Sequence, residues 1–182
     1  IDTLIETHKL PYDKSDEPGF MRSRWSFAEW GGVDGKSVVS LELDGMGLDG
    51  ILDVRGLDSL ENLSFSGNKV NQLLTDQLSN LKRLSCDNNT LTALDLEYYP
   101  SLIFLECSTN NLDRLEMLPA HLEWLACSDN GFQELDFTGL FSLAVFHGEN
   151  LALKRFTTPQ GIQLRMDALR LSLLHISEPT SR

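Results

Sequence analysis

The sequence lacks features that would point directly to membranes or nucleic acids. It has no uninterrupted apolar run of 18 or more residues, so it predicts no membrane-spanning helix. Basic residues are scarce: 15 Lys and Arg stand against 27 Asp and Glu, giving a formal net charge of -12. Nucleic acids and anionic membranes are bound through basic patches, so neither is expected as a partner. The acidic balance favours a basic partner only weakly, because solubility alone also explains it.

The chain also lacks the motifs of common catalytic and cofactor sites. It contains no phosphate-binding loop, no dinucleotide-binding fingerprint and no nucleophile-elbow motif. The acidic segment DGMGLDGILD, residues 44–53, lacks the spacing and terminal glutamate of an EF-hand, so a solvated turn is its ordinary interpretation over a calcium site. Four histidines lack a spacing partner typical of a metal pair or a triad: His8, His121, His147 and His175. We therefore expect no enzymatic activity and no cofactor.

What the sequence does contain is a repeated unit of 20 to 22 residues, L-x-x-L-x-[L/C]-x-x-N-x-L. A repeat at such a period indicates an array of stacked supersecondary units. Within each unit, alternation at positions four to six predicts a short strand with one face buried, and successive strands stack in parallel. We number the units repeats 1–6, and they open at Val38, Leu60, Leu81, Leu102, Leu122 and Leu143.

Two polar or reactive residue types recur at fixed positions of the unit. Asparagine at position nine can donate to and accept from backbone groups at a turn, which predicts a structural ladder of Asn68, Asn89, Asn110 and Asn130. Cysteine at position six is interpreted as a small apolar core residue, at Cys86, Cys107 and Cys127. Side chains running side by side on parallel strands suit a disulfide poorly. A redox-active or metal-binding cysteine ladder is the alternative.

The unit resembles the leucine-rich repeat family, in its shorter bacterial type. The resemblance implies an α/β-type leucine-rich repeat solenoid, or horseshoe. Its parallel β-sheet would lie on the concave face, and its convex side would be mostly irregular or 3₁₀, because 20 or 21 residues leave little room for a helix. We expect three parts: residues 1–35 as an N-terminal segment and cap, residues 36–156 as an array of about six repeats, and residues 157–182 as a degenerate C-terminal end.

The N-terminal end, WSFAEWGGVDGKSVVSLELDGMGLDG at residues 25–50, resembles the cap and first repeat of receptor-type leucine-rich repeat proteins. Trp25, Trp30 and Val33 are expected to cover the open apolar end of the array. Plant receptor caps carry paired cysteines, and no cysteine precedes Cys86, which favours a bacterial relative. Residues 1–24 are polar and rich in turn formers, so we expect them to be loosely held.

The C-terminal end departs from the repeat. After Leu143 the register fades, because Gly148 fills the core position and Asn150 stands one place early. The final segment LSLLHISEPTSR, residues 171–182, resembles the translation of a DNA-library adapter. We expect it to be an artefact and the chain to be a fragment without its natural C-terminal cap. A genuine amphipathic tail is the alternative.

Positions three, five and seven of the unit are expected on the concave face. Aromatic side chains follow one another there in repeats 4 and 5, rimmed by acidic groups, and such a patch is typical of a binding hot spot. The candidate partner-binding residues are Arg83, Asp87, Phe104, Glu106, Trp124, Ser128, Asp129, Val145 and His147. The alternative is that the aromatic pair is covered by the N-terminal segment or by a missing module.

The sequence thus predicts a non-enzymatic protein–protein interaction module, from a bacterial surface or secreted protein, that binds a protein or peptide on its concave face. An extracellular or cell-surface location is weakly favoured by the family resemblance. LPAHLEWLACSDNGF, residues 118–132, also resembles units of secreted bacterial effectors, some of which carry a ubiquitin ligase domain that would be missing here. A third interpretation is an adhesin or carbohydrate-binding module, suggested by exposed aromatic residues near acidic groups.

Overall fold

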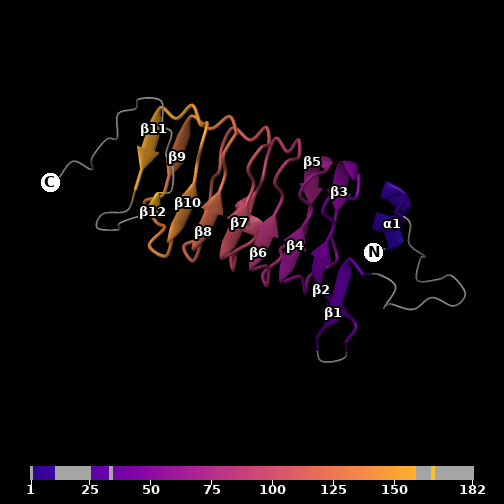
Figure 1. Cartoon of the computed structure of the whole chain (residues 1–182). Coiled ribbons are helices and arrows are strands. Elements are labelled where there is room, and N and C mark those ends of the chain that lie inside the picture. Colours follow the sequence, from indigo (N-terminus) through magenta and orange to yellow (C-terminus); the bar gives the residue numbers. More distant parts are fainter. Residues whose placement is uncertain (1, 11–25, 33–34, 159–164, 167–182) are drawn as a thin grey trace, which may run out of the picture.

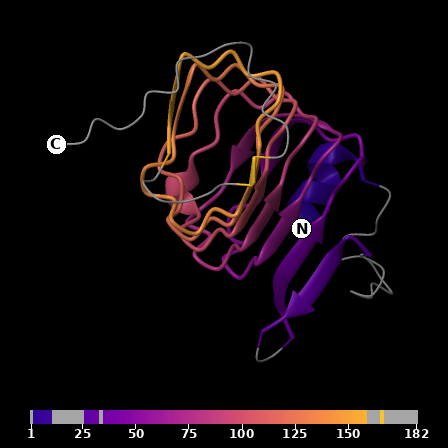
Figure 2. The same cartoon turned by 60° about the vertical axis from the view of Figure 1, so that its left-hand side comes forward.

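The chain winds into a solenoid of about six turns built from parallel strands with little helix (Figure 1). The computed structural model describes residues 2–10, 26–32, 35–158 and 165–166. Viewed from a second side, the turns wind about a common axis (Figure 2), and the buried apolar side chains form one core cluster along the array. The predicted fold class is confirmed. Within the described residues, no helix is long and apolar enough to cross a membrane.

One face of the solenoid is an eight-stranded sheet, whose solvent side we call the concave face. Its strands run in register from one repeat to the next, and β1 alone is antiparallel to its neighbour. In spatial order the strands are β1 (Ala28–Gly31), β2 (Ser37–Glu42), β4 (Asn62–Ser64), β6 (Arg83–Ser85), β7 (Phe104–Glu106), β8 (Trp124–Ala126), β10 (Val145–His147) and β12 (Arg165–Met166).

The opposite, convex side is less regular, as a short repeat requires. Two small parallel sheets lie there, one at each end of the array: β3 (Asp49–Asp53) pairs with β5 (Lys69–Leu74), and β9 (Glu134–Asp136) pairs with β11 (Arg155–Thr157). Between them, repeat 3 closes with a 3₁₀ turn, η2 (Leu96–Tyr98), whose N-cap residue Asp95 accepts a hydrogen bond from the backbone N–H of Glu97.

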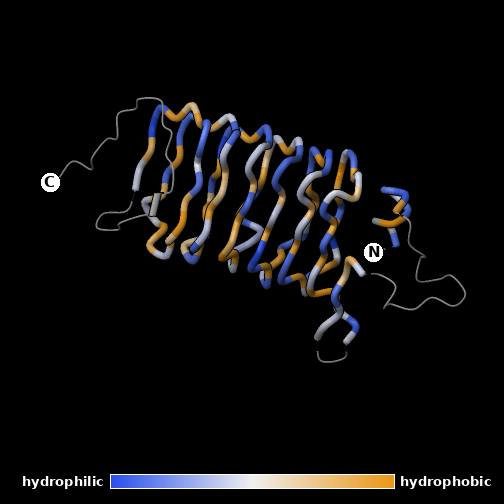
Figure 3. The backbone as a smooth tube through the Cα atoms, viewed as in Figure 1, coloured by the Kyte–Doolittle hydropathy of each residue, from blue (hydrophilic) through white to orange (hydrophobic). Residues whose placement is uncertain are grey.

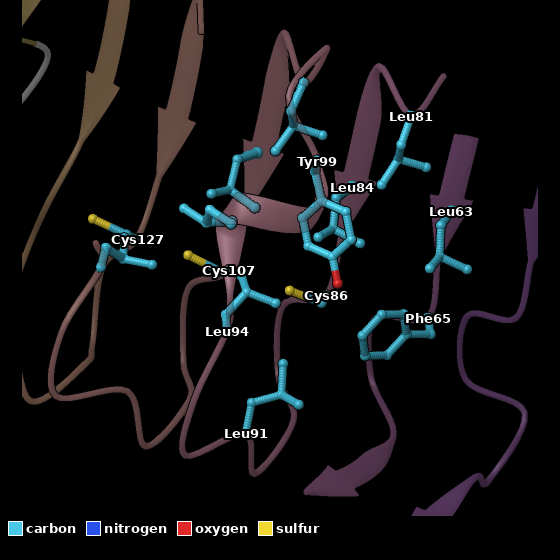
Figure 4. Close-up of a cluster of buried hydrophobic side chains, with 14 of the residues drawn as sticks. Leu63, Phe65, Leu81, Leu84, Cys86, Leu91, Leu94, Tyr99, Cys107 and Cys127 are labelled. Atoms are coloured by element: carbon cyan, nitrogen blue, oxygen red, sulfur yellow. The ribbon is translucent and has the colours of Figure 1, made fainter. Parts of the chain in front are cut away.

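Positions one, four, six and eleven of the repeat fill the core, and they recur as apolar segments along the tube (Figure 3). Cys86, Cys107 and Cys127 all have no exposed surface and follow one another along the axis (Figure 4). Burial raises the pKa of each of the three thiols well above its ordinary value. All three are free thiols. They therefore act as small apolar core side chains rather than as nucleophiles.

The asparagine ladder joins each repeat to the one before it. Asn110 accepts from the backbone N–H of Leu91 at 3.0 Å and donates to the carbonyl oxygens of Cys86 at 3.0 Å and Cys107 at 3.2 Å. Asn68, Asn89 and Asn130 make the equivalent bonds in their own repeats. Each asparagine therefore satisfies buried backbone groups that no strand ladder reaches.

The residue before each asparagine position has a left-handed backbone conformation in all six repeats. Position eight holds two glycines, then Asn88, Thr109, Asp129 and Asn150, with φ between 54° and 70°. Asparagine, aspartate and glycine tolerate this region, whereas a β-branched residue does so only under strain. Thr109, with φ of 55°, is therefore the strained member of the series.

Residues 2–10 differ from the prediction that residues 1–24 are loosely held and turn-rich, whereas residues 11–24 lie outside the described residues. Residues 2–8 form helix α1 (Asp2–His8), and Ile5 and Leu10 join the buried core with 4% and 7% exposure. Helix α1 contacts β3 at the end of the array, where apolar side chains would otherwise face water. Trp30 packs partly buried against the core, as expected of a cap residue. Trp25 and Val33 lie outside the described residues.

The C-terminal register also differs from the prediction, because it does not fade at Leu143. Strand β10 pairs in register with β8. At Gly148 a Cβ atom would lie 2.3 Å from the ring of Phe146, so the large residue at position four occupies the space left by the small one at position six. Asn150 is not a displaced ladder residue but the left-handed residue of its repeat. The tail 171–182 lies outside the described residues.

Candidate binding face

Position three of each repeat forms one continuous row across the concave face. Arg83 pairs with Phe104, Phe104 with Trp124, and Trp124 with Val145 in the strand register. Ser40 and Asn62 continue the row toward the N-terminal end. Position five forms a second row beside it, which runs Glu42, Ser64, Ser85, Glu106, Ala126 and His147. The side chains predicted for this face are therefore brought together on it.

The aromatic row is the set Phe104, Trp124 and His147. The rings of Phe104 and Trp124 stack with centroids 5.3 Å apart and an interplanar angle of 13°. The His147 ring lies 5.1 Å from Trp124 and is tilted by 47°. Each side chain is half-buried by its neighbours. Helix α1 packs elsewhere, against β3, so the described part of the N-terminal segment does not cover the row.

Trp124 carries an unusual polar atom. Its indole Nε1 is shielded from solvent and has no hydrogen-bond partner among the residues that the structure describes. A buried donor without a partner costs about 1–3 kcal/mol, so the Trp124 N–H adds nothing favourable to the stability of the face. The indole ring contributes through its stacking contacts with Phe104 and His147.

Arg83 and Glu106 mark the edge of the aromatic row. The Arg83 guanidinium carbon lies 3.7 Å from the centre of the Phe104 ring, and its Nη2 lies 3.5 Å from Glu106 Oε2. Glu106 also accepts a hydrogen bond of 3.0 Å from the hydroxyl of Ser85. The Arg83 charge is therefore turned toward β7 and is partly neutralised there.

Position seven, at the end of each strand, bonds to the following repeat. Asp87 Oδ1 accepts from the backbone N–H of Ser108 at 2.5 Å, Ser108 Oγ accepts from that of Ser128 at 3.1 Å, and Ser128 Oγ accepts from that of Glu149 at 2.9 Å. Desolvation by burial raises the Asp87 pKa to about 6. The predicted binding residues Asp87 and Ser128 thus already support the backbone of the next repeat.

The remaining predicted residues lie at the rim of the face. Asp129 is exposed, sits at the left-handed position of repeat 5 and accepts a hydrogen bond from the side chain of Asn150. Val145 is half-buried beside Trp124, and Arg165 follows it in the strand register. Within the described residues, no group of three or more His, Cys, Asp or Glu side chains is placed to hold a metal ion.

A second feature of the face includes only Arg83 of the predicted binding residues. A hollow of about 230 Å³, which we call the polar hollow, opens over β1, β2 and β4 and is lined by Glu29, Ser40, Glu42, Asn62, Ser64 and Arg83. The short side chains of Ser40, Asn62 and Ser64 in repeats 1 and 2 are the sequence signal for it. Glu29 could not be placed there from sequence, because it reaches the face only through the antiparallel pairing of β1 with β2.

The parallel sheet, the asparagine ladder and the rows of the concave face define the chain as a leucine-rich repeat solenoid. Among solved structures it is similar to the functional domain of InlJ from Listeria monocytogenes, described as including a cysteine ladder, with 33% sequence identity and a TM-score of 0.53. The similarity covers 59% of this chain and 27% of the InlJ chain, so it involves little more than a quarter of that chain. No family model matches the sequence, and a comparison with curated proteins gives no match.

Proposed function

We propose that the chain is a non-enzymatic binding module that takes a protein partner on its concave face, within a bacterial surface or secreted protein. The observation that carries this proposal is the aromatic row, an apolar strip on the solvent side of a rigid sheet with charged groups at its edges. Clusters of this composition are typical of interface hot spots. The similarity to a Listeria InlJ domain supports the bacterial origin.

The geometry favours a protein over a glycan as the partner. A sugar ring binds by stacking on an open aromatic face, but Phe104 and His147 occupy the surroundings of the Trp124 ring. The half-buried row, with Val145 beside it, suits apolar side chains of a partner. The carbohydrate-binding interpretation is therefore the weaker one.

The effector interpretation concerns sequence outside this chain. A ubiquitin ligase of the catalytic-cysteine type needs an accessible cysteine thiolate, whereas all three cysteines here are fully buried and have raised pKa values. Any such activity would have to reside in a further domain, with this solenoid supplying only partner recognition.

Selection from a random peptide display library tests the proposed face. We expect most selected peptides to lose at least about tenfold in affinity for Phe104→Asp, because a charge would replace the central aromatic ring; tenfold corresponds to about 1.4 kcal/mol. Phe141→Asp is the matched control, since Phe141 is 69% exposed and lies outside the strands of the concave face. Equal affinities of the two variants for the selected peptides would contradict the proposal. Far-ultraviolet circular dichroism checks that both variants fold.

A further inference from the structure

The polar hollow lies beside the aromatic row and has a different chemistry. Ser40 and Asn62 stand side by side in the position-three row, and Glu42 and Ser64 stand side by side in the position-five row. Glu29 faces Ser40 across the antiparallel pairing of β1 and β2, which adds a carboxylate to the end of the group. The side chains at the centre are short, which leaves the sheet surface recessed between the two glutamates.

Ser40 lies at the floor of the polar hollow and lacks a partner of its own. Its residue is only 4% exposed, and its hydroxyl, which makes no side-chain hydrogen bond among the described residues, is not sealed from solvent but opens into the hollow. Hydroxyl groups in largely buried residues normally have a hydrogen-bond partner, so one that has none in the chain and opens into a hollow is available to a ligand.

The other polar atoms of the hollow mostly accept hydrogen bonds. Glu29 and Glu42 bring two carboxylates, and the Ser64 hydroxyl already donates its hydrogen to Asp44 Oδ1, so its oxygen can only accept. Arg83 lines the opposite wall, but its guanidinium is turned toward Phe104 and Glu106. The hollow therefore favours a cationic group with several donors.

We propose that the polar hollow binds an arginine side chain of the partner, next to the apolar side chains held by the aromatic row. This inference rests on the proposed function, because it names one chemical feature of the partner at the same face. A guanidinium has five donors in a rigid planar arrangement, and these match acceptors on several walls better than the three donors of an ammonium group. A lysine would leave some of these acceptors unpaired.

The experiment uses the ¹⁵N-labelled full chain and two short peptides as probes. One peptide is acetyl-Gly-Arg-Gly-amide, and the other replaces arginine with citrulline, which has the same shape without the charge. We expect the arginine peptide to shift the backbone amide signals of Ser40, Glu42, Asn62 and Ser64, and the citrulline peptide to leave them in place. The apparent dissociation constant should rise at least about tenfold in the Glu29→Gln/Glu42→Gln double variant.

A second double variant controls for net charge. Glu97→Gln/Glu116→Gln removes the same two charges from exposed residues on the convex side and should leave arginine-peptide binding unchanged. The inference is overturned if the two peptides shift the same signals equally, if both double variants weaken binding equally, or if the arginine peptide shifts none of these signals. The peptide-library test with Phe104→Asp probes the aromatic row, whereas the arginine-peptide titration probes the polar hollow. A failure of the proposed function and a failure of this inference can therefore be told apart.

Discussion

The two halves of the solenoid differ on both sides of the same sheet. In repeats 1–3 the core is mainly leucine, and the concave face carries serine, asparagine and glutamate around the polar hollow. In repeats 4–6 the concave face carries the aromatic row, and the core beneath its C-terminal end contains a cluster of phenylalanine rings with centroids 5.0 to 5.8 Å apart: Phe137, Phe146 and Phe156.

The difference shows that the positions that hold the backbone together and the positions that form the binding face are separate positions of the repeat. Both halves have the same parallel register, the same left-handed position and the same asparagine bonds to the previous repeat. Positions three and five can therefore vary in size and polarity without a change of backbone. The predictions below test this separation, beginning with the part that both halves share.

The largest effect is expected where the shared ladder is removed. Asn110→Ala would leave the Leu91 N–H without its acceptor and the Cys86 and Cys107 carbonyl oxygens without the Asn110 donor, all inside the array. We expect a loss of about 3 kcal/mol in the free energy of unfolding, measured by urea denaturation. Asn111→Ala, at an exposed neighbouring position, should change it by less than about 0.5 kcal/mol. Similar losses for both would refute a special role for the ladder.

A pair of substitutions tests the core difference between the halves. Gly148→Cys restores the residue type of repeats 3–5 but places a side chain against the Phe146 ring, and we expect a loss of about 2 kcal/mol. Phe146→Leu in the same chain should recover most of this loss, because leucine is the residue that accompanies cysteine in repeats 3–5. A double-mutant cycle of thermal unfolding measures the coupling. Additive losses would show that the two positions do not share space.

On the concave face, the loss of stability caused by a substitution at position three should differ between repeats 1–3 and repeats 4–6. Trp124→Ala removes the stacking contacts with Phe104 and His147 and is expected to cost about 1.5 kcal/mol, since the unpaired Nε1 is removed as well. Asn62→Ala, at the same position in repeat 2, should remain within about 0.5 kcal/mol of the parent chain. Equal losses of stability in urea denaturation would remove the distinction between the two halves of the concave face.

Repeat 4 is the first of the repeats that carry the aromatic row, and it contains the strained Thr109. Replacing it with asparagine, which holds the same conformation at Asn88, should stabilise the chain by about 0.5–1 kcal/mol. The increase would be read as a higher melting temperature in calorimetry. An unchanged or lower value would show that the threonine side chain makes contacts worth more than the relief of strain.

The smallest effect concerns the pH dependence at Asp87. Its pKa is raised from 3.8 to about 6, mainly because burial disfavours the charged form. The folded chain then holds the Asp87 proton more tightly than the unfolded chain, so this group lowers stability as pH rises from about 4 to about 6. Asp87→Asn keeps an acceptor for the Ser108 N–H and should lack this decline, relative to the parent chain, in urea denaturation between pH 4 and pH 7. Parallel pH profiles would contradict the assignment.

Much of this structure could be predicted because the repeat fixes the register. Once the strands were assigned, Arg83, Phe104 and Trp124 had to be neighbours, and the asparagines had to stack. The features that could not be predicted depend on contacts outside the repeat pattern. Glu29 reaches the concave face by a hairpin, and helix α1 docks through Ile5. The exchange of space between Phe146 and Gly148 depends on side-chain direction, which the repeat pattern does not specify.

The asparagine ladder also determines how such an array can change in length. Every rung joins fixed positions of two adjacent repeats and reaches no further, whether the repeats are 20 or 21 residues apart. A whole repeat could therefore be duplicated or deleted while each remaining rung still finds its acceptors and donors, as long as the end of the array stays covered. Gene duplication could thus move the aromatic row away from the polar hollow, or bring it nearer, in steps of one strand spacing.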